Sequence, residues 1–323
     1  MTKFTLFGGE KVKVKIGLLF IFALALLFML SANVKAENLG GNPTRVKVGV
    51  WLVNVEKVDL AANSYRLDLY LWFRFNSSEI SLNDIKAFEF VNGAPSSQSE
   101  VYANETEGYL EYRIRGEFLK TFDFSRYPFE THKLTVELEH KKLNTSYLVF
   151  EEDALTPSGV DESANVAGWE LGDFSAETVT HVYSGGEEYS RFVFSINLKR
   201  PVISAFIKSI LPISAITTIS LLAFFISPQN FAQRIGLGVT TLMSATAFHL
   251  SLLSGIPPTG YLTLADRIML SIYIIFLYNL SVSVYIMKLV DAKKQEEAQK
   301  INKKALKTLA ILIIVLVIAQ VIL

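Results

Sequence analysis

Hydrophobic and polar residues are arranged differently in the two halves of the chain. From about Arg45 to Lys199, short runs alternate large apolar and polar residues, as in Tyr65–Phe75 (YRLDLYLWFRF). From Pro201 onward, long apolar segments follow one another with few charges. A period of two is typical of strands with one buried face, and long apolar segments are typical of membrane-spanning helices. The pattern therefore predicts a β-rich first domain and a helical membrane domain.

Turn residues divide the first domain into short elements. Asn92-Gly93, Pro157-Ser158-Gly159 and Ser184-Gly185-Gly186 separate the alternating runs. Many short strands bounded by turn signals, without a long amphipathic helix, favour an Ig-like antiparallel β-sandwich of about 155 residues.

The second domain contains four hydrophobic segments: Pro201–Ile226, Phe231–Leu253, Ala265–Leu289 and Leu309–Leu323. The linker Asp291–Lys307 holds six lysines, whereas Gly255–Leu264 holds no lysine or arginine. Because basic loops stay in the cytoplasm, the first linker is expected inside and the second outside. This topology places the β-sandwich outside the cell membrane, with four helices crossing it.

The N-terminus has the features of a secretory signal. Lys11, Lys13 and Lys15 lie directly before the apolar run Ile16–Leu30, and Val34-Lys35-Ala36 fits a cleavage pattern. These features predict a signal peptide over residues 1–36, with an uncleaved membrane anchor as the alternative. The expected domains are then the signal peptide (1–36), the outer β-sandwich (37–199) and a four-helix transmembrane domain (200–323).

Composition narrows the function classes. The 323 residues have a formal net charge of zero and include no cysteine, which argues against a nucleic-acid partner and rules out disulfides and thiolate metal sites. His132, His140, His181 and His249 are scattered without metal-ligand spacing. No nucleophile elbow, P-loop or dinucleotide-binding motif is present. We expect neither an enzyme nor a bound cofactor or metal.

The second hydrophobic segment carries the most informative pattern. Gly236, Thr240, Met243, Ala247 and Leu250 recur at steps of four and three residues, which places them on one stripe of a helix. Glycine and hydroxyl residues are poorly suited to face lipid, so such a stripe faces either another helix or water. The stripe is therefore either a helix-packing seam or the lining of a pore.

Five short motifs, in order, carry a resemblance to a known family. They are Phe124–Glu130 (FSRYPFE), Gly168-Trp169-Glu170, Lys199-Arg200-Pro201, Arg234–Thr241 (RIGLGVTT), and Ile256-Pro257 followed by Tyr261. Together they resemble the pentameric ligand-gated, or Cys-loop-type, ion channels, in particular the prokaryotic branch. Lys120 and Leu134 stand where animal members carry the two loop cysteines, so the disulfide of that loop is absent.

The resemblance implies a homopentamer, in which this chain and four further copies of itself surround an ion pathway across the lipid bilayer. The pathway would carry inorganic ions and be lined by the second helix. The implied pore-lining residues are Gln233, Gly236, Thr240, Met243, Ala247 and Leu250. Met243 and Leu250 would form the hydrophobic gate, since apolar rings lose water when helices close in. Family members usually carry leucine where Met243 stands.

The same resemblance bears on ion selectivity. Cation-selective members place glutamate just before the position of Arg234, whereas Ala232 and Gln233 are neutral. Arg234 itself matches a basic residue of both cation and anion channels. The missing acidic ring favours an anion-selective or poorly selective pore, and cation selectivity stays open.

Coupling between the two domains would run through their junction. The residues that the resemblance assigns to it are Asp59, Tyr127, Pro128, Phe129, Glu130, Arg200, Pro257 and Tyr261. The family pairs its arginine before the first helix with an acid, and Asp59 and Glu130 are the two candidates for Arg200.

The agonist site of the family lies between subunits and is lined by aromatic residues. The matching positions here are Tyr70, Phe150, Glu152, Tyr183 and Tyr189. Aromatic faces beside a carboxylate suit a small-molecule agonist such as an amine. The Trp-x-Pro pattern expected before Phe88–Val91 is missing, however, and some prokaryotic members respond to protons. Glu151, Glu152, Asp153 and His249 are the candidates for that role.

Two other functions would account for part of the pattern. A non-conducting, membrane-anchored solute sensor would explain the sandwich and the helices, but gives no reason for the stripe on the second helix. A membrane enzyme or transporter would need clustered catalytic groups or internal repeats, which the chain lacks.

Overall fold

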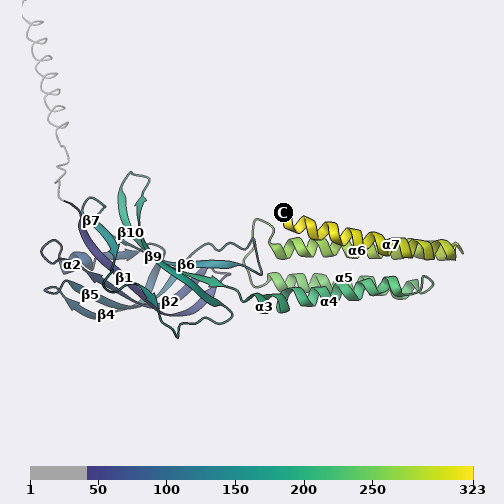
Figure 1. Cartoon of the computed structure of the whole chain (residues 1–323), viewed down its shortest axis with the longest axis horizontal. Helices are drawn as coiled ribbons and strands as arrows, with labels where there is room; N and C mark the ends of the chain where they lie inside the picture. Colours follow the sequence, from purple (N-terminus) through teal and green to yellow (C-terminus); the bar gives the residue numbers. More distant parts are fainter. Residues whose placement is uncertain (1–41, 323) are drawn as a thin grey trace, which may run out of the picture. The chain divides into compact units, whose positions relative to one another are not determined.

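The structure, a computed structural model, describes residues 42–322. The predicted signal peptide (1–36) lies outside these residues. From Pro43 onward the chain forms one compact unit, in which strands are followed by long helices (Figure 1).

Ten strands of the described residues form two sheets. Their bounds are β1 (Thr44–Asp59), β2 (Ser64–Arg74), β3 (Phe88–Phe90), β4 (Gly93–Asn104), β5 (Tyr109–Leu119), β6 (Thr131–His140), β7 (Leu148–Glu152), β8 (Gly159–Val160), β9 (Glu170–Val182) and β10 (Glu188–Lys199). One sheet has the order β4-β5-β2-β1-β7, with β8 also paired to β1, and the other has the order β3-β6-β10-β9. A short helix, α2 (Leu82–Ile85), precedes β3.

The pairing differs from the predicted antiparallel pattern along one strand, β1. β1 pairs in parallel with β7, from Thr44–Leu148 to Val48–Glu152, and in parallel with β8. The chain crosses to the second sheet through β6 before it returns as β7, and such a long crossover permits parallel pairing where a hairpin does not.

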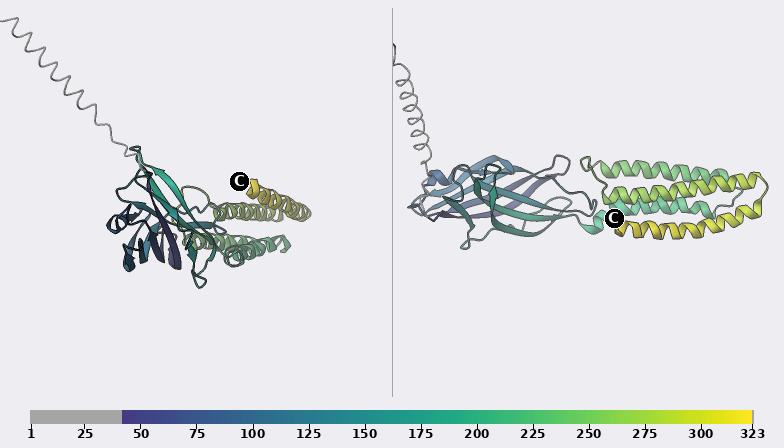
Figure 2. Two further views of the ribbon diagram at one scale, coloured as in Figure 1. Left: turned by 60° about the vertical axis from the view of Figure 1, so that its left-hand side comes forward. Right: turned by 90° about the horizontal axis from the view of Figure 1, so that it is seen from above.

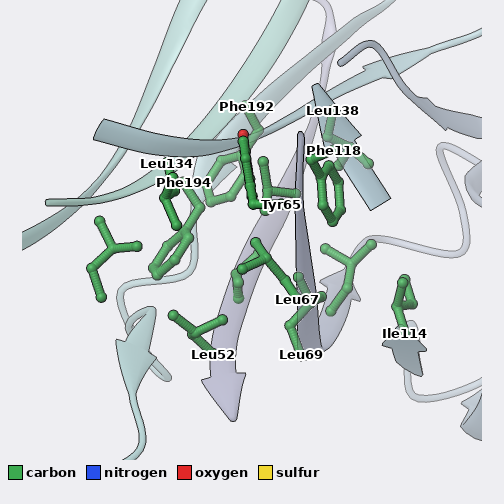
Figure 3. Packing of buried hydrophobic residues seen from close by; sticks show 14 of the residues in the cluster. Leu52, Tyr65, Leu67, Leu69, Ile114, Phe118, Leu134, Leu138, Phe192 and Phe194 are labelled. Carbon is green, nitrogen blue, oxygen red and sulfur yellow. The ribbon is translucent and has the colours of Figure 1, made fainter. Parts of the chain in front are cut away.

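The sandwich is held by the apolar faces of both sheets. Leu52, Leu67 and Leu69 of the first sheet lie opposite Phe192 and Phe194 of the second (Figure 3). These side chains are buried, and each buried leucine or phenylalanine contributes about 1.5–3 kcal/mol relative to exposure. The alternation read from the sequence is thus the alternation of core-facing positions.

The helices follow the last strand after two residues. They are α3 (Val202–Ala205), a π turn η1 (Phe206–Ile210), α4 (Leu211–Leu221), a 3₁₀ turn η2 (Leu222–Phe225), α5 (Phe231–Leu253), α6 (Leu264–Asp291) and α7 (Gln295–Ile322). α4, α5, α6 and α7 run side by side (Figure 2). Three spans of the described residues are long and apolar enough to cross a membrane, namely Val202–Phe225, α5 and α6.

Local chemistry explains several helix boundaries. Pro212 has no N–H to donate, and the π turn η1 comes directly before the turn that contains it. α6 begins with a capping box, in which the Thr263 hydroxyl accepts from the Asp266 backbone N–H and the Asp266 carboxylate accepts from the Thr263 backbone N–H. α5 has the bounds predicted from the sequence.

The start of the last helix was predicted wrongly. The sequence predicts a charged linker over Asp291–Lys307 and a helix from Leu309, but α7 begins at Gln295. Glutamate, lysine, glutamine and alanine are good helix formers, and Glu296 and Glu297 in the first turn favour the positive end of the helix dipole. Hydrophobicity alone located the apolar part of this helix and missed its polar first half.

Candidate functional site

The predicted stripe lies on one exposed face of α5. Gln233, Gly236, Thr240, Met243, Ala247 and Leu250 are all exposed in the single chain. Met243 and Leu250 are 68% and 69% exposed. A Cβ added at Gly236 would meet no heavy atom within 4 Å, so the face is open at this position.

The opposite face of α5 packs against the other helices. Arg234, Gly238, Thr241 and Ala245 are its buried residues. Gly238 lies against α6, where its added Cβ would stand 3.5 Å from Leu280 Cδ1. The small residues of the packing seam are therefore a different set from the residues of the stripe.

The sandwich and the helices meet through the loop Lys120–Glu130. The Tyr127 hydroxyl donates to the Leu252 carbonyl oxygen at the end of α5 (2.8 Å). The backbone N–H groups of Leu264 and Ala265, at the start of α6, donate to the carbonyl oxygens of Ser125 and Tyr127 (both 3.0 Å). This loop thus contacts both ends of the α5–α6 connection.

An ion pair completes the junction. Arg200, which follows β10, donates from Nε to Glu130 Oε1 at 2.8 Å. The Glu130 side chain is 1% exposed, and the Arg200 guanidinium stacks on the rings of Trp169 (4.5 Å) and Tyr127 (5.5 Å). A guanidinium held between a buried carboxylate and two aromatic faces has little freedom to move independently.

Asp59 is not the partner of Arg200. Its carboxylate instead accepts from Lys57 Nζ (2.7 Å) and from the Ala62 backbone N–H (3.0 Å). These bonds hold the pKa of Asp59 below its usual value, with the Lys57 hydrogen bond as the largest cause. The local turn between β1 and β2 satisfies this acid, so of the two candidates Glu130 forms the pair.

The remaining predicted coupling residues lie around the same loop. Pro128 is buried and Phe129 is partly buried. The Tyr261 hydroxyl accepts from the Phe124 backbone N–H (2.8 Å) and donates to Asp123 Oδ1 (3.2 Å). Pro257 is partly buried on the α5–α6 connection. The structure therefore brings all of these residues to the junction except Asp59, for which it gives only local contacts.

His132 is a buried titratable group beside this ion pair. Its ring packs against Phe122, Phe124 and Trp169, and its Nε2 lies 4.0 Å from Glu130 Oε1 without a hydrogen bond. Burial, and next the charge of Arg200, lower the pKa of His132 from 6.5 to about 4. The ring is therefore neutral in the folded protein at pH 7.

This burial predicts a pH dependence of stability. Between pH 6.5 and about 4 the unfolded chain binds a proton at His132 that the folded chain does not. The free energy of unfolding should thus fall as pH is lowered through this range, by at most about 3 kcal/mol. We expect His132→Gln to reduce the drop in the thermal denaturation midpoint between pH 7.5 and pH 4.5. His181→Gln, in the β9–β10 hairpin, is the control. An undiminished drop in His132→Gln would contradict this assignment.

The predicted agonist residues divide into two groups. Tyr183 and Tyr189 lie together at the β9–β10 turn, with ring centroids 5.6 Å apart. His181 packs edge-on to Tyr183 at 4.6 Å. The Tyr183 hydroxyl donates to Glu139 (2.8 Å), which also binds Arg191 (2.7 Å). This hairpin presents the exposed ring of Tyr183 and the partly buried ring of Tyr189 near the buried Glu139 carboxylate.

The other group is less available to a ligand. Phe150 is 1% exposed and packs against Phe73 in the core, so its ring lines no accessible surface and its assignment to a ligand site is corrected. The face of Tyr70 is covered by the Arg113 guanidinium at 4.6 Å, and its hydroxyl accepts from Arg113 Nη1. Glu152 is exposed and accepts from the Ser158 backbone N–H (3.2 Å).

The remaining candidates for a proton response have partners. Glu151 pairs with Arg45. Asp153 is buried and accepts from Trp72 Nε1 and Arg74 Nε (both 3.2 Å). His249, on α5, lies between the Tyr273 hydroxyl (3.0 Å) and Asp266 Oδ1 (3.1 Å) of α6.

Two residues of the bundle and junction were not predicted from the sequence. Trp169 was noted only as part of a motif, but its ring covers Arg200. Asn302 was assigned to a linker, but it is a helical residue that accepts from Arg234 Nη2 at 2.8 Å. A helix assignment from the Glu, Lys and Ala content of Gln295–Lys307 would have drawn attention to Asn302.

Comparisons with known proteins agree with this architecture. Residues 209–318 match the family described as the neurotransmitter-gated ion-channel transmembrane region. A proton-gated ion channel of Gloeobacter violaceus is 22% identical over 260 residues, which cover 74% of this chain and 71% of the relative.

Receptor subunits of animals match as well. The human gamma-aminobutyric acid receptor subunit rho-3 is 25% identical over 158 residues, covering 49% of this chain and 34% of the subunit. The chicken (Gallus gallus) subunit beta-4 is 21% identical over 265 residues, covering 73% and 54%. The chain thus spans about a third to a half of these two receptor subunits.

A β-sandwich joined to apolar helices, with these matches, defines a membrane channel of the receptor type. These matches support the pentameric ligand-gated ion channels, or Cys-loop receptor superfamily, as the family of the chain, which has no cysteine to form the loop disulfide. Members of this family are channels and not enzymes. The protein is accordingly a multi-pass membrane protein with its sandwich outside the cell.

Proposed function

We propose that the protein is a homopentameric ion channel in which five copies of α5 line the pathway. The exposed face of α5 is the observation that carries this proposal. Glycine, threonine and glutamine there are poor lipid-facing residues, whereas the small residues of the opposite face are already buried in the chain's own bundle. A water-filled pathway between copies accounts for both faces.

The stripe would then divide into two functional parts. Gln233, Gly236 and Thr240 would form a wettable inner half, where threonine hydroxyls replace part of an ion's water shell. Met243, Ala247 and Leu250 would form an apolar outer half. Met243 and Leu250 are seven residues apart, or about 10 Å along the helix, so two hydrophobic rings two turns apart would form the gate.

Gating would pass from the sandwich to α5 through the junction. The Glu130–Arg200 pair ties the residue directly before β6 to the start of the first membrane helix, and Tyr127 bonds to the end of α5. Pro257 and Tyr261, on the α5–α6 connection, would transmit the displacement together with Pro128 and Phe129. A movement of the second sheet therefore has a hydrogen-bonded route to both ends of the α5–α6 connection.

The channel would open to a small-molecule agonist, such as an amine, or to protons. Tyr183 and Tyr189 offer aromatic faces to an ammonium group, with Glu152 on the same side of the subunit contact and Tyr70 contributed by a neighbouring copy. Tyr70 would have to release Arg113 first. A proton response is supported by the bacterial relative, which is a proton-gated channel.

We place the domains as follows: a signal peptide over 1–36, the agonist-binding sandwich over 37–199 and the pore domain over 200–323. The last strand ends at Lys199 and the first helix begins at Val202. The pore is proposed to be anion-selective or poorly selective, because no carboxylate stands among Ala232, Gln233 and Arg234.

One experiment tests the proposal. The purified protein would be placed in planar bilayers under a KCl gradient, and current recorded from pH 4 to pH 9 and with a panel of small amines. We expect current that reverses nearer the chloride potential than the potassium potential. Reversal at the potassium potential would refute the selectivity assignment alone. No current under any condition, from verified pentamers, would refute the channel and favour a membrane-anchored sensor.

A further inference from the structure

Arg234 is a buried cation one residue beyond the exposed Gln233. It is 0% exposed and lies on the face of α5 opposite the stripe. Its Nη1 donates to the Ile226 carbonyl oxygen (3.4 Å), and its guanidinium lies 5.9 Å from the ring centre of Phe224. The arginine therefore points into the turn that joins the first two membrane helices.

Its closest hydrogen bond reaches a different helix. Arg234 Nη2 donates to Asn302 Oδ1 on α7 at 2.8 Å. The same amide donates from Nδ2 to the Phe224 carbonyl oxygen at 2.9 Å. The side-chain amide of Asn302 thus connects α7 to α5 through its oxygen and to the turn before α5 through its nitrogen.

All of these partners are neutral. None of the ion pairs within residues 42–322 includes Arg234, and its Nε has no hydrogen-bond partner. Carbonyl and amide oxygens can stabilise a guanidinium without cancelling its net charge, and screening is weak in a dry interior. The positive charge consequently persists behind the inner end of the stripe.

The distance to the proposed pathway is short. Arg234 neighbours Gln233 in sequence and lies two residues before Gly236, and an α-helix with its side chains is about 10–12 Å across. In a five-copy assembly the guanidiniums would form a ring behind the narrow inner half of the pore. A ring of fixed positive charge in a low-dielectric surrounding favours the entry of anions over cations.

We propose that Asn302 is a positioning residue that holds Arg234 behind the inner mouth, so that α7 contributes to the charge selectivity of the pore. The neutral amide keeps the guanidinium in place while leaving its charge uncompensated. This inference rests on the proposed function, because it requires α5 to line the pathway.

Asn302→Asp tests the inference directly. Aspartate has nearly the same shape, keeps an acceptor for Arg234 Nη2 and adds the missing counter-charge. We expect the chloride-to-potassium permeability ratio, measured from reversal potentials, to fall by roughly threefold or more, since five compensated charges weaken the field together. Gln299→Asp is the matched control, because Gln299 is an exposed residue one turn earlier on α7 and its replacement adds the same charge to the same helix in water.

Asn302→Ala separates charge from packing. It removes both hydrogen bonds but leaves Arg234 uncompensated, so its effect on the permeability ratio should be smaller than that of Asn302→Asp. An equal or larger effect in Asn302→Ala would overturn the inference, as would an unchanged ratio in Asn302→Asp pentamers or an equal shift in Gln299→Asp. Absence of current from the unmodified protein would instead contradict the proposed function itself.

Discussion

Replacing Met243 by serine should open the channel without agonist. Met243 is the first large apolar residue of the exposed stripe, and it is 68% exposed in the single chain. Five serines in its place would hold water where five methionines exclude it, which removes the energetic advantage of the closed, dewetted pore. We expect the agonist-free open probability to rise at least tenfold, which corresponds to about 1.4 kcal/mol in the closed–open equilibrium.

The measurement is the agonist-free current of Met243→Ser relative to the unmodified channel, normalised to the amount of pentamer in the membrane. Leu277→Ser is a suitable control, since Leu277 is also an exposed apolar residue of the bundle (56%), but lies on α6. Its closed state should be unchanged. If Met243→Ser leaves the closed state as tight as before, Met243 is not part of the gate.

Replacing Arg200 by glutamine should largely uncouple the sandwich from the pore. The change leaves the Glu130 carboxylate, 1% exposed, without its cation, and removing one partner of a buried pair typically costs roughly 3–5 kcal/mol. It also removes the stacked guanidinium from Trp169 and Tyr127. We expect the agonist or proton concentration for half-maximal current to increase more than tenfold, or the response to disappear.

A double variant distinguishes coupling by the ion pair from simple damage. In Glu130→Gln/Arg200→Gln no charge is left buried and unpaired, so the loss should be smaller than in Arg200→Gln alone. Lys57→Gln, which removes the cation beside the exposed Asp59, is the surface control and should have little effect. If the double variant loses as much of the agonist or proton response as Arg200→Gln alone, Arg200 does not act by compensating the charge of Glu130.

Much of the architecture was predictable because it depends on short-range periodicity. The alternation in Tyr65–Phe75 identified core-facing positions of β2, and the four-and-three spacing of α5 identified residues that share its exposed face. Whether a side chain shares a face with its neighbours depends only on the period of the element. The same local logic failed at α7, since hydrophobicity does not distinguish a charged linker from the polar first half of a helix.

Residue partners were decided by the tertiary structure. Asp59 and Glu130 were equal candidates for Arg200 in the sequence, and only the packing of β6 against the end of β10 selects Glu130. Phe150 stood among ligand-site positions, yet the pairing of β7 with β1 turns its ring into the core. Asn302 meets Arg234 across 68 residues of chain. Such contacts depend on how whole helices and strands pack together. The spacing of residues along the chain does not predict that packing.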